Sequence, residues 1–200
     1  EGRRGEPSQK PPFPFEKGLF ESPTIINLKS RADILYSLKE KLDAVEELVL
    51  NIRVGGNDLS HAFGFRRSSS QSIHSIRAIS NILSDIVTVF GMDYVISGPV
   101  WEYYAGSNWD IGLKNELEED RLCGFVGKTV IHPNQIELVN HAYKVSRKDL
   151  DDARSILDWD TGSNALVSGS VAKERMNEYK THSNWALKII MLAEVYGVVE

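Results

Sequence analysis

The feature that most limits the possible folds is an apolar, strand-like run that passes directly into a helical pattern. Residues 125–131 are mainly apolar or β-branched, and Gly124 and Pro133 bound them, which predicts a buried strand of a parallel sheet. From Asn134 onward the apolar spacing becomes helical, and Pro133 suits a first helical turn. We therefore expect a strand that ends at His132 and a helix that begins at once.

The same alternation of strand and helix is repeated along the chain before this run. Earlier strands are expected at residues 17–21, 48–54 and 94–97. Helices are expected at residues 30–45, 73–90, 108–121 and from 134 onward. Strand–helix units in series predict an α/β fold in which helices cover a parallel sheet.

The two ends of the chain depart from this pattern. The N-terminal residues are rich in proline, glycine and charge, which predicts a disordered lead-in. A loop rich in glycine, serine and aspartate begins at Trp159, and residues 171–195 predict a closing helix with Met176 among its buried positions. The expected organisation is a lead-in at 1–16, a main domain at 17–158, and a C-terminal loop and helix extension at 159–200.

Composition narrows the class of protein and its partners. The chain has 23 basic and 28 acidic residues and a net charge of −5, so it lacks the excess of basic residues that is typical of nucleic-acid-binding proteins. No run approaches the ~20 apolar residues of a membrane helix, and no signal peptide is readable at the start. The single cysteine, Cys123, cannot form an internal disulfide, and we expect it to be buried and inert. A cytoplasmic protein without membrane or nucleic-acid partners is predicted.

Two carboxylates follow consecutive predicted strands, Glu21 after the first and Asp58 after the second. A parallel sheet brings the carboxyl ends of neighbouring strands to one edge, so the two side chains are expected side by side. Such a pair either shares a proton or binds a hard cation such as Mg²⁺. The alternative is that Glu21 is a surface residue and Asp58 caps a turn or helix.

Other candidate site residues each have a structural alternative. His132 is either a packed or loop-bonded histidine or a member of a site. Arg66 beside Arg67 and a serine-rich loop can bind phosphate or carboxylate, or it can be solvated. The aromatic residues 101–104 suit either a pocket wall or a core, and the acidic residues 116–120 suit a solvated helix face.

Several of these motifs together resemble one known family. Residues 127–136, Gly-Lys-Thr-Val-Ile-His-Pro-Asn-Gln-Ile, are similar to the final barrel strand of the citrate lyase beta-subunit family, within the HpcH/HpaI aldolase group of (β/α)8 barrels. Residues 55–60 and 20–23 resemble two further strand-end motifs of that family. Residues 97–103 and 176–185 resemble more narrowly its bacterial branch of C–C bond lyases of the TIM-barrel fold, which is linked to tellurium-resistance operons.

The resemblance implies a Mg²⁺-dependent carbon–carbon bond lyase that acts on a keto or hydroxy acid or its CoA thioester. Its implied metal ligands are Glu21 and Asp58, its substrate-binding residues Gly56, Asn57 and Arg66, and its catalytic residues Glu178 and His132. Glu178 stands where relatives carry an acid that reaches a neighbouring subunit, which implies a homo-oligomer. We expect hydrogen bonds to hold His132, so that it shapes the site floor without transferring protons.

A complete (β/α)8 barrel runs to about 250 residues, whereas only four βα units are expected here. The implied fold is therefore the C-terminal half of a TIM barrel, about four βα units, plus C-terminal helices. We expect an inner face, including Ile52, Val54, Val95 and Val130, to lack a partner layer, and the chain alone to self-associate. Two alternatives are a non-catalytic remnant or binding module that keeps the scaffold, and a standalone flavodoxin-like ligand-binding domain.

Overall fold

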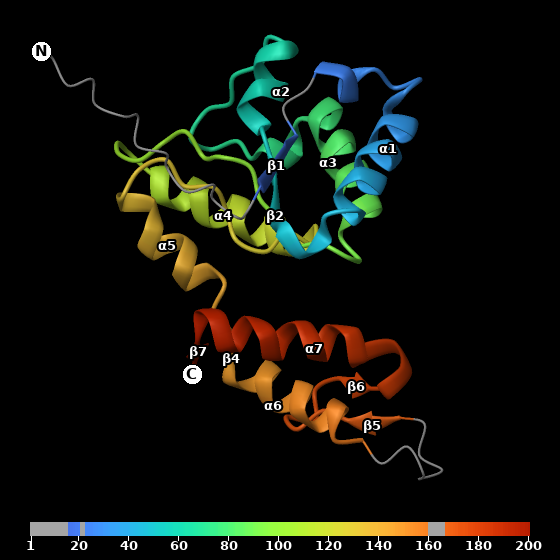
Figure 1. Ribbon diagram of the computed structural model, residues 1–200. Helices are drawn as coiled ribbons and strands as arrows, with labels where there is room; N and C mark the ends of the chain where they lie inside the picture. Colours follow the sequence, from blue (N-terminus) through green and yellow to red (C-terminus); the bar gives the residue numbers. More distant parts are fainter. Residues whose placement is uncertain (1–15, 21–22, 160–166) are drawn as a thin grey trace, which may run out of the picture. The chain divides into compact units, whose positions relative to one another are not determined.

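The computed structural model describes residues 16–20, 23–159 and 167–200 (Figure 1). These residues divide into two compact units, which are described separately. The first comprises the described residues up to Val100 together with 123–129, and the second comprises 101–122 and the described residues from 130 onward. Most of the predicted lead-in, and Glu21, lie outside the described residues.

A parallel sheet forms the centre of the first unit. Its strands are β1 (Glu16–Phe20), β2 (Val49–Val54) and β3 (Ile96–Ser97), in the order β1-β2-β3. The register pairs Phe20 with Val54 and Ile52 with Ile96. Spatial order therefore follows chain order, as it does in a (β/α)8 barrel, whereas a flavodoxin-like sheet doubles back on itself.

The fourth predicted strand, at residues 125–131, is found only in part. This segment runs parallel to the chain at β3, with a bridge between Gly98 and Lys128 and backbone hydrogen bonds such as Val126 N–H to the Ile96 carbonyl at 2.8 Å, but it does not form a regular strand. Gly124 and Gly127 have φ values of +98° and +81°, outside the range of a regular strand. Phe125 is buried, whereas Val130 and Ile131 are exposed. Apolar composition alone therefore overstated how far the strand extends.

Helices pack on one face of this sheet. The unit contains α1 (Arg31–Asp43), α2 (Gly56–Ala62) and α3 (Arg77–Phe90), with short 3-10 turns η1 (Pro23–Ile26), η2 (Glu46–Leu48) and η3 (Ile73–Ser75). Helices α1 and α3 lie side by side (Figure 1). Helix α3 buries an apolar face. Helix α2 follows β2 directly and was not among the expected helices; Leu59 is buried in the core and anchors it there.

The two faces of β2 differ in chemistry because successive strand residues point to opposite sides. Ile52 and Val54 are buried in the core beneath the helices. Arg53, on the opposite face, donates through Nε to Thr129 Oγ1 at 3.1 Å. The expectation that Ile52 and Val54 would lack a partner layer is therefore wrong, because their parity directs them to the helices.

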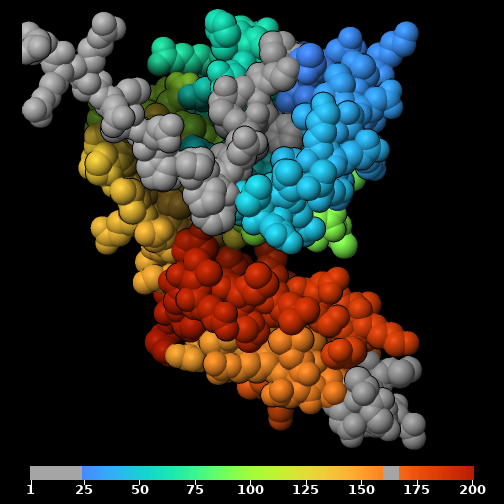
Figure 2. Space-filling view, in the orientation of Figure 1, coloured from blue at the N-terminus to red at the C-terminus, as the bar shows by residue number. Residues whose placement is uncertain are grey.

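The second unit is mainly helical. It contains α4 (Trp109–Leu122), α5 (Asn134–Ala142), α6 (Arg147–Leu157) and α7 (Tyr179–Tyr196). Short strands pair in two places, β4 (Val145–Ser146) with β7 (Val198–Val199) and β5 (Ser168–Gly169) with β6 (Met176–Asn177). Helices α6 and α7 pack closely against each other along their lengths (Figure 2).

Three local expectations fail in or beside this unit. Helix α7 begins at Tyr179, so Met176 belongs to a β-pair and is exposed. Glu116 and Asp120 are fully buried on α4, so this helix does not present a purely solvated acidic face. Cys123, in the first unit, is exposed and not buried.

The chain is an α/β protein with the serial parallel order of a partial TIM barrel, followed by C-terminal helices. Its described strands do not form a closed barrel. None of the helices in the described part of the chain combines the length and apolar character that crossing a bilayer requires.

Candidate functional site

The carboxyl ends of β1 and β2 are the first element of the candidate site. The pairing of Phe20 with Val54 means that the chain leaves both strands at one edge of the sheet. Asp58 lies in the first turn of α2 and is exposed. Glu21 comes directly after β1 but lies outside the described residues, so its pairing with Asp58 stays a prediction.

Close packing at Gly56 fixes the position of α2. A Cβ atom at Gly56 would lie 2.5 Å from Pro99 Cβ and 2.6 Å from Ile73 Cδ1, so only glycine fits without a shift. Ser60 Oγ donates to the Gly56 carbonyl at 2.9 Å, and Leu59 is buried. Inward anchoring by Gly56 and Leu59 leaves the Asp58 carboxylate on the outer side of the turn. Gly56 is thus a packing residue, and its part in substrate binding stays a prediction.

Arg31 anchors the segment that follows β1, a role that the sequence analysis missed. Its guanidinium donates to the carbonyls of Ile25 at 2.6 Å and Ile26 at 3.2 Å, and to Asp85 Oδ2 at 2.8 Å. Arg31 is buried, and these three acceptors join η1 and α3 to α1. A basic residue at the first position of a helix, where a cation is unfavourable, was the available signal.

The two arginines beside the serine-rich loop differ in their exposure and in their contacts. Arg66 is exposed, whereas Arg67 is buried and donates through Nη2 to the Val100 carbonyl. The loop that follows is closed by its own bonds, since Gln71 Oε1 accepts from the Ser68 amide at 2.9 Å. Arg66 therefore keeps the candidate role of meeting an anionic ligand, and Arg67 has a structural contact.

In the second unit, His132 is held on two sides. Its Nδ1 accepts a hydrogen bond from the Asn134 backbone N–H at 3.2 Å. The ring stacks on Tyr104 with centroids 4.0 Å apart and planes at 13°. These contacts agree with the expectation that the turn holds the imidazole, and its part in a site stays a prediction.

Gln135 ties the segment around Tyr104 to this turn, and sequence reasoning did not identify it. Its Nε2 donates to the carbonyls of Trp101 and Tyr103, both at 2.8 Å, while its Oε1 accepts from the Ile131 amide at 3.0 Å. Gln135 is 1% exposed, so these bonds form in a dry environment where they are costly to lose. A single buried amide thus fixes two chain segments.

Glu178 occupies the residue before α7. Its backbone N–H donates to His182 Nδ1 at 2.9 Å, and its Oε2 accepts from Thr181 Oγ1 at 3.2 Å. The side chain is half-buried. Within the described residues, no hydrogen bond or ring contact joins Glu178 to His132.

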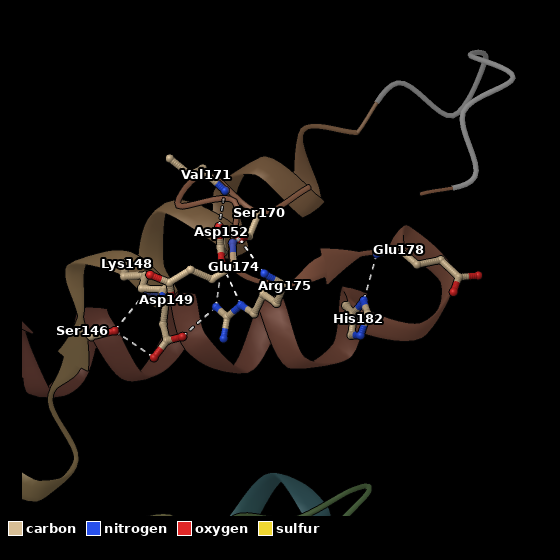
Figure 3. Close-up of polar contacts among 10 residues, drawn as sticks. All are labelled: Ser146, Lys148, Asp149, Asp152, Ser170, Val171, Glu174, Arg175, Glu178 and His182. Atoms are coloured by element: carbon tan, nitrogen blue, oxygen red, sulfur yellow. Dashed lines mark hydrogen bonds and ion pairs between the residues drawn. The ribbon is translucent and has the colours of Figure 1, made fainter. Parts of the chain in front are cut away.

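A polar cluster just before Glu178 fixes the chain there (Figure 3). Asp152, which is fully buried on α6, accepts from Arg175 Nε and from the Val171 amide, each at 2.8 Å. Arg175 also pairs with Asp149 at 2.7 Å and lies 4.9 Å over the Trp185 ring. We call Asp149, Asp152 and Arg175 the arginine clamp.

Asp149 also takes part in the capping of helix α6 by Ser146. Ser146 Oγ accepts from the Asp149 amide at 3.0 Å and so caps α6. Burial disfavours the charged carboxylate, but hydrogen bonds from Arg175 and Ser146 outweigh it and lower the pKa of Asp149. The Asp149–Arg175 pair is therefore charged under neutral conditions.

Comparison with known proteins assigns the family. The family described as C-C bond lyase of the TIM-barrel fold matches residues 18–198, and the chain belongs to it. Citrate lyase subunit beta of Escherichia coli K12 is 33% identical over 55 residues, which are 28% of this chain and 18% of that protein. The same subunit from E. coli O6:H1 matches equally.

Two solved structures are similar in fold. CitE from Mycobacterium tuberculosis, in complex with magnesium, acetoacetate and coenzyme A, has a TM-score of 0.52 and 21% identity over 74% of this chain. A citrate lyase from Burkholderia xenovorans LB400 has a TM-score of 0.62 and 14% identity over 92% of this chain. The chain spans about half of each, 53% and 54% respectively.

Proposed function

We propose that this chain is part of a Mg²⁺-dependent carbon–carbon bond lyase that acts on a keto or hydroxy acid or its CoA thioester. One observation carries the proposal. The family of C–C bond lyases matches almost the whole chain, and Asp58 lies at the shared carboxyl edge of two parallel strands. That edge is where enzymes of this architecture place their chemistry.

The donor set at this edge suits a hard cation. Asp58 is an exposed carboxylate, and the neighbouring Asn57 offers an amide oxygen, both of the kind that Mg²⁺ prefers. In the proposal Asp58 and Glu21 hold the ion, and rigid packing at Gly56 keeps the Asp58 turn in place. A bound Mg²⁺ would polarise a substrate oxygen and stabilise developing negative charge.

The proposed substrate class follows from the relatives and from local charge. CitE from M. tuberculosis was solved with acetoacetate and coenzyme A, a keto acid and an acyl carrier. Arg66 is an exposed cation in the same unit as Asp58 and suits the carboxylate of such a substrate. Asn57 supplies a further polar contact in this proposal.

Two further residues complete the proposed machinery. Glu178 is proposed as the acid that works at the site of a neighbouring copy, in a cytoplasmic homo-oligomer, with the arginine clamp fixing the chain before it. His132 is proposed as a site residue that binds without transferring a proton. Because the chain spans about half of each solved relative, activity is proposed for the complete barrel.

The experiment is a cleavage assay on this chain, alone and mixed with a separately supplied barrel half. Keto acids, hydroxy acids and their CoA thioesters are tested with and without Mg²⁺. We expect Mg²⁺-dependent cleavage that Asp58→Ala abolishes, while Asp33→Ala, which removes another exposed aspartate, leaves the rate unchanged. Cleavage that survives in Asp58→Ala would refute the metal assignment. A complete barrel with no activity on any member of the panel would favour the binding-module alternative.

A further inference from the structure

The contacts of the turn at His132 determine which nitrogen of the imidazole ring carries its proton. A backbone N–H can only donate, so the nitrogen that accepts from Asn134 must have a free lone pair. That nitrogen is Nδ1, and a neutral imidazole then carries its proton on Nε2. The geometry thus selects one tautomer of His132.

The orientation of the ring is fixed as well. Tyr104 covers one face of the imidazole, with ring centroids 4.0 Å apart. Tyr104 is itself held, because its carbonyl accepts from Asn134 Nδ2 at 3.1 Å. Gln135 holds the carbonyls of Trp101 and Tyr103 just before it. Rotation of His132 about χ1 would break the Asn134 bond and the stack together, and a flip of the ring about χ2 would break the Asn134 bond.

The opposite nitrogen remains available. In the described part of the chain, no group accepts a hydrogen bond from His132 Nε2. The His132 residue is also partly exposed. An oriented N–H that the protein does not use is suited to an oxygen of a bound ligand.

We propose that His132 presents its Nε2–H as a fixed, neutral hydrogen-bond donor to a carboxylate or carbonyl oxygen of the ligand, with Tyr104 as the positioning residue. The proton stays on Nε2 throughout, so no proton transfer is involved. The identity of the ligand as a keto acid rests on the proposed function, whereas the tautomer and the orientation do not. His132 then acts as a donor, and a general base is not required of it.

The first test reads the tautomer directly from the ¹⁵N shifts of the labelled full chain above neutral pH. We expect Nδ1 of His132 to show the shift of an unprotonated nitrogen and Nε2 that of a protonated one. His61, which is exposed and whose imidazole makes no hydrogen bond among the described residues, serves as the internal control and should show averaged tautomers. A protonated Nδ1, or averaged shifts like those of His61, would overturn the proposal.

The second test separates a ligand donor from a purely structural role. His132→Asn keeps an oxygen near the Nδ1 position for the Asn134 amide but has no donor near Nε2, whereas His132→Gln keeps a donor there. Both variants are checked for folding by their melting curves. The probe is acetoacetate with Mg²⁺, titrated into the full chain and followed at the amides of residues 132–135.

We expect His132→Asn to weaken acetoacetate binding by about 10-fold to 100-fold, the value of one hydrogen bond to a charged group. His132→Gln should lose about threefold at most, because its amide N–H replaces Nε2–H. Unchanged binding in His132→Asn, or equal losses in both variants, would overturn the donor role. If the wild-type chain binds Mg²⁺ at Asp58 but not acetoacetate, the ligand role of His132 fails and the metal proposal stands.

Discussion

Replacing Arg175 with methionine should strongly destabilise the α6–α7 pair. The reason is that Asp152 is 0% exposed and takes two of its bonds from this guanidinium, Nε at 2.8 Å and Nη2 at 2.7 Å. In Arg175→Met the carboxylate would stay buried with the Val171 amide as its remaining donor among the described residues. A buried charge without its partner is one of the most costly local defects in a protein.

The magnitude follows from the exposure of each partner. Breaking a buried ion pair by removing one member costs about 3–5 kcal/mol. The Arg175 side chain is 41% exposed, so water can reach the edge of the cluster and the expected value is about 3 kcal/mol. Loss of the Asp149 contact adds about 0–1 kcal/mol, because that carboxylate is 31% exposed.

Amide hydrogen exchange across α6 and α7 measures this loss locally, which matters because the chain forms two units. Lys180→Met, an exposed lysine in the first turn of α7, is the matched control and should change the free energy of opening by less than about 0.5 kcal/mol. The double variant Arg175→Met/Asp152→Leu should be more stable than Arg175→Met alone, since no buried charge is left. An Arg175→Met protein that opens no more easily than the control would refute the reasoning.

Two further predictions concern packing and pH in the first unit. Gly56→Ala should destabilise it by about 1–3 kcal/mol through overpacking against Pro99, whereas Gly169→Ala, where a Cβ meets no atom within 4 Å, should be neutral in urea unfolding. Burial and the hydrogen bond to Asp43 raise the pKa of Tyr94 to about 12, above its value in the unfolded chain. The stabilisation that this hydrogen bond contributes is therefore complete below the unfolded pKa and is lost as pH rises toward 12. Tyr94→Phe should flatten this alkaline dependence of the unfolding free energy, and an unchanged profile would contradict the assignment.

Local sequence patterns correctly predicted those helices and strands that bury one face in the core. Helix α3 has apolar residues at helical spacing and was placed correctly from residue 77 onward, because a single core face dictates that period. Strand β2 was found within one residue, since Gly55 and Gly56 end it.

The failures come from information that is not local. Residues 125–131 looked like a full strand, yet positive φ values at Gly124 and Gly127 bend the backbone away from regular pairing. Apolar character could not show that Ile131 ends on the surface, or that Glu116 ends in the interior.

For the candidate site, sequence reasoning identified Asp58, Arg66, His132 and Glu178 but not the residues that hold the surrounding chain. Gln135, Arg31 and Arg175 act through contacts that include residues 34, 54 and 23 positions away, respectively, and no motif spacing encodes such pairs. Their signal was a polar side chain placed where the helical pattern predicts burial or an unfavourable charge.

The position of a bound divalent ion is the most direct test of the central proposal, that the carboxyl edge of β1 and β2 is a metal site. Mn²⁺, which broadens nearby signals, is titrated into the ¹⁵N-labelled full chain in place of Mg²⁺. We predict that the amides of residues 55–59 broaden first and that Asp58→Ala abolishes this effect. Broadening that begins elsewhere, such as at the acidic helix α4, and that persists in Asp58→Ala would contradict the proposal.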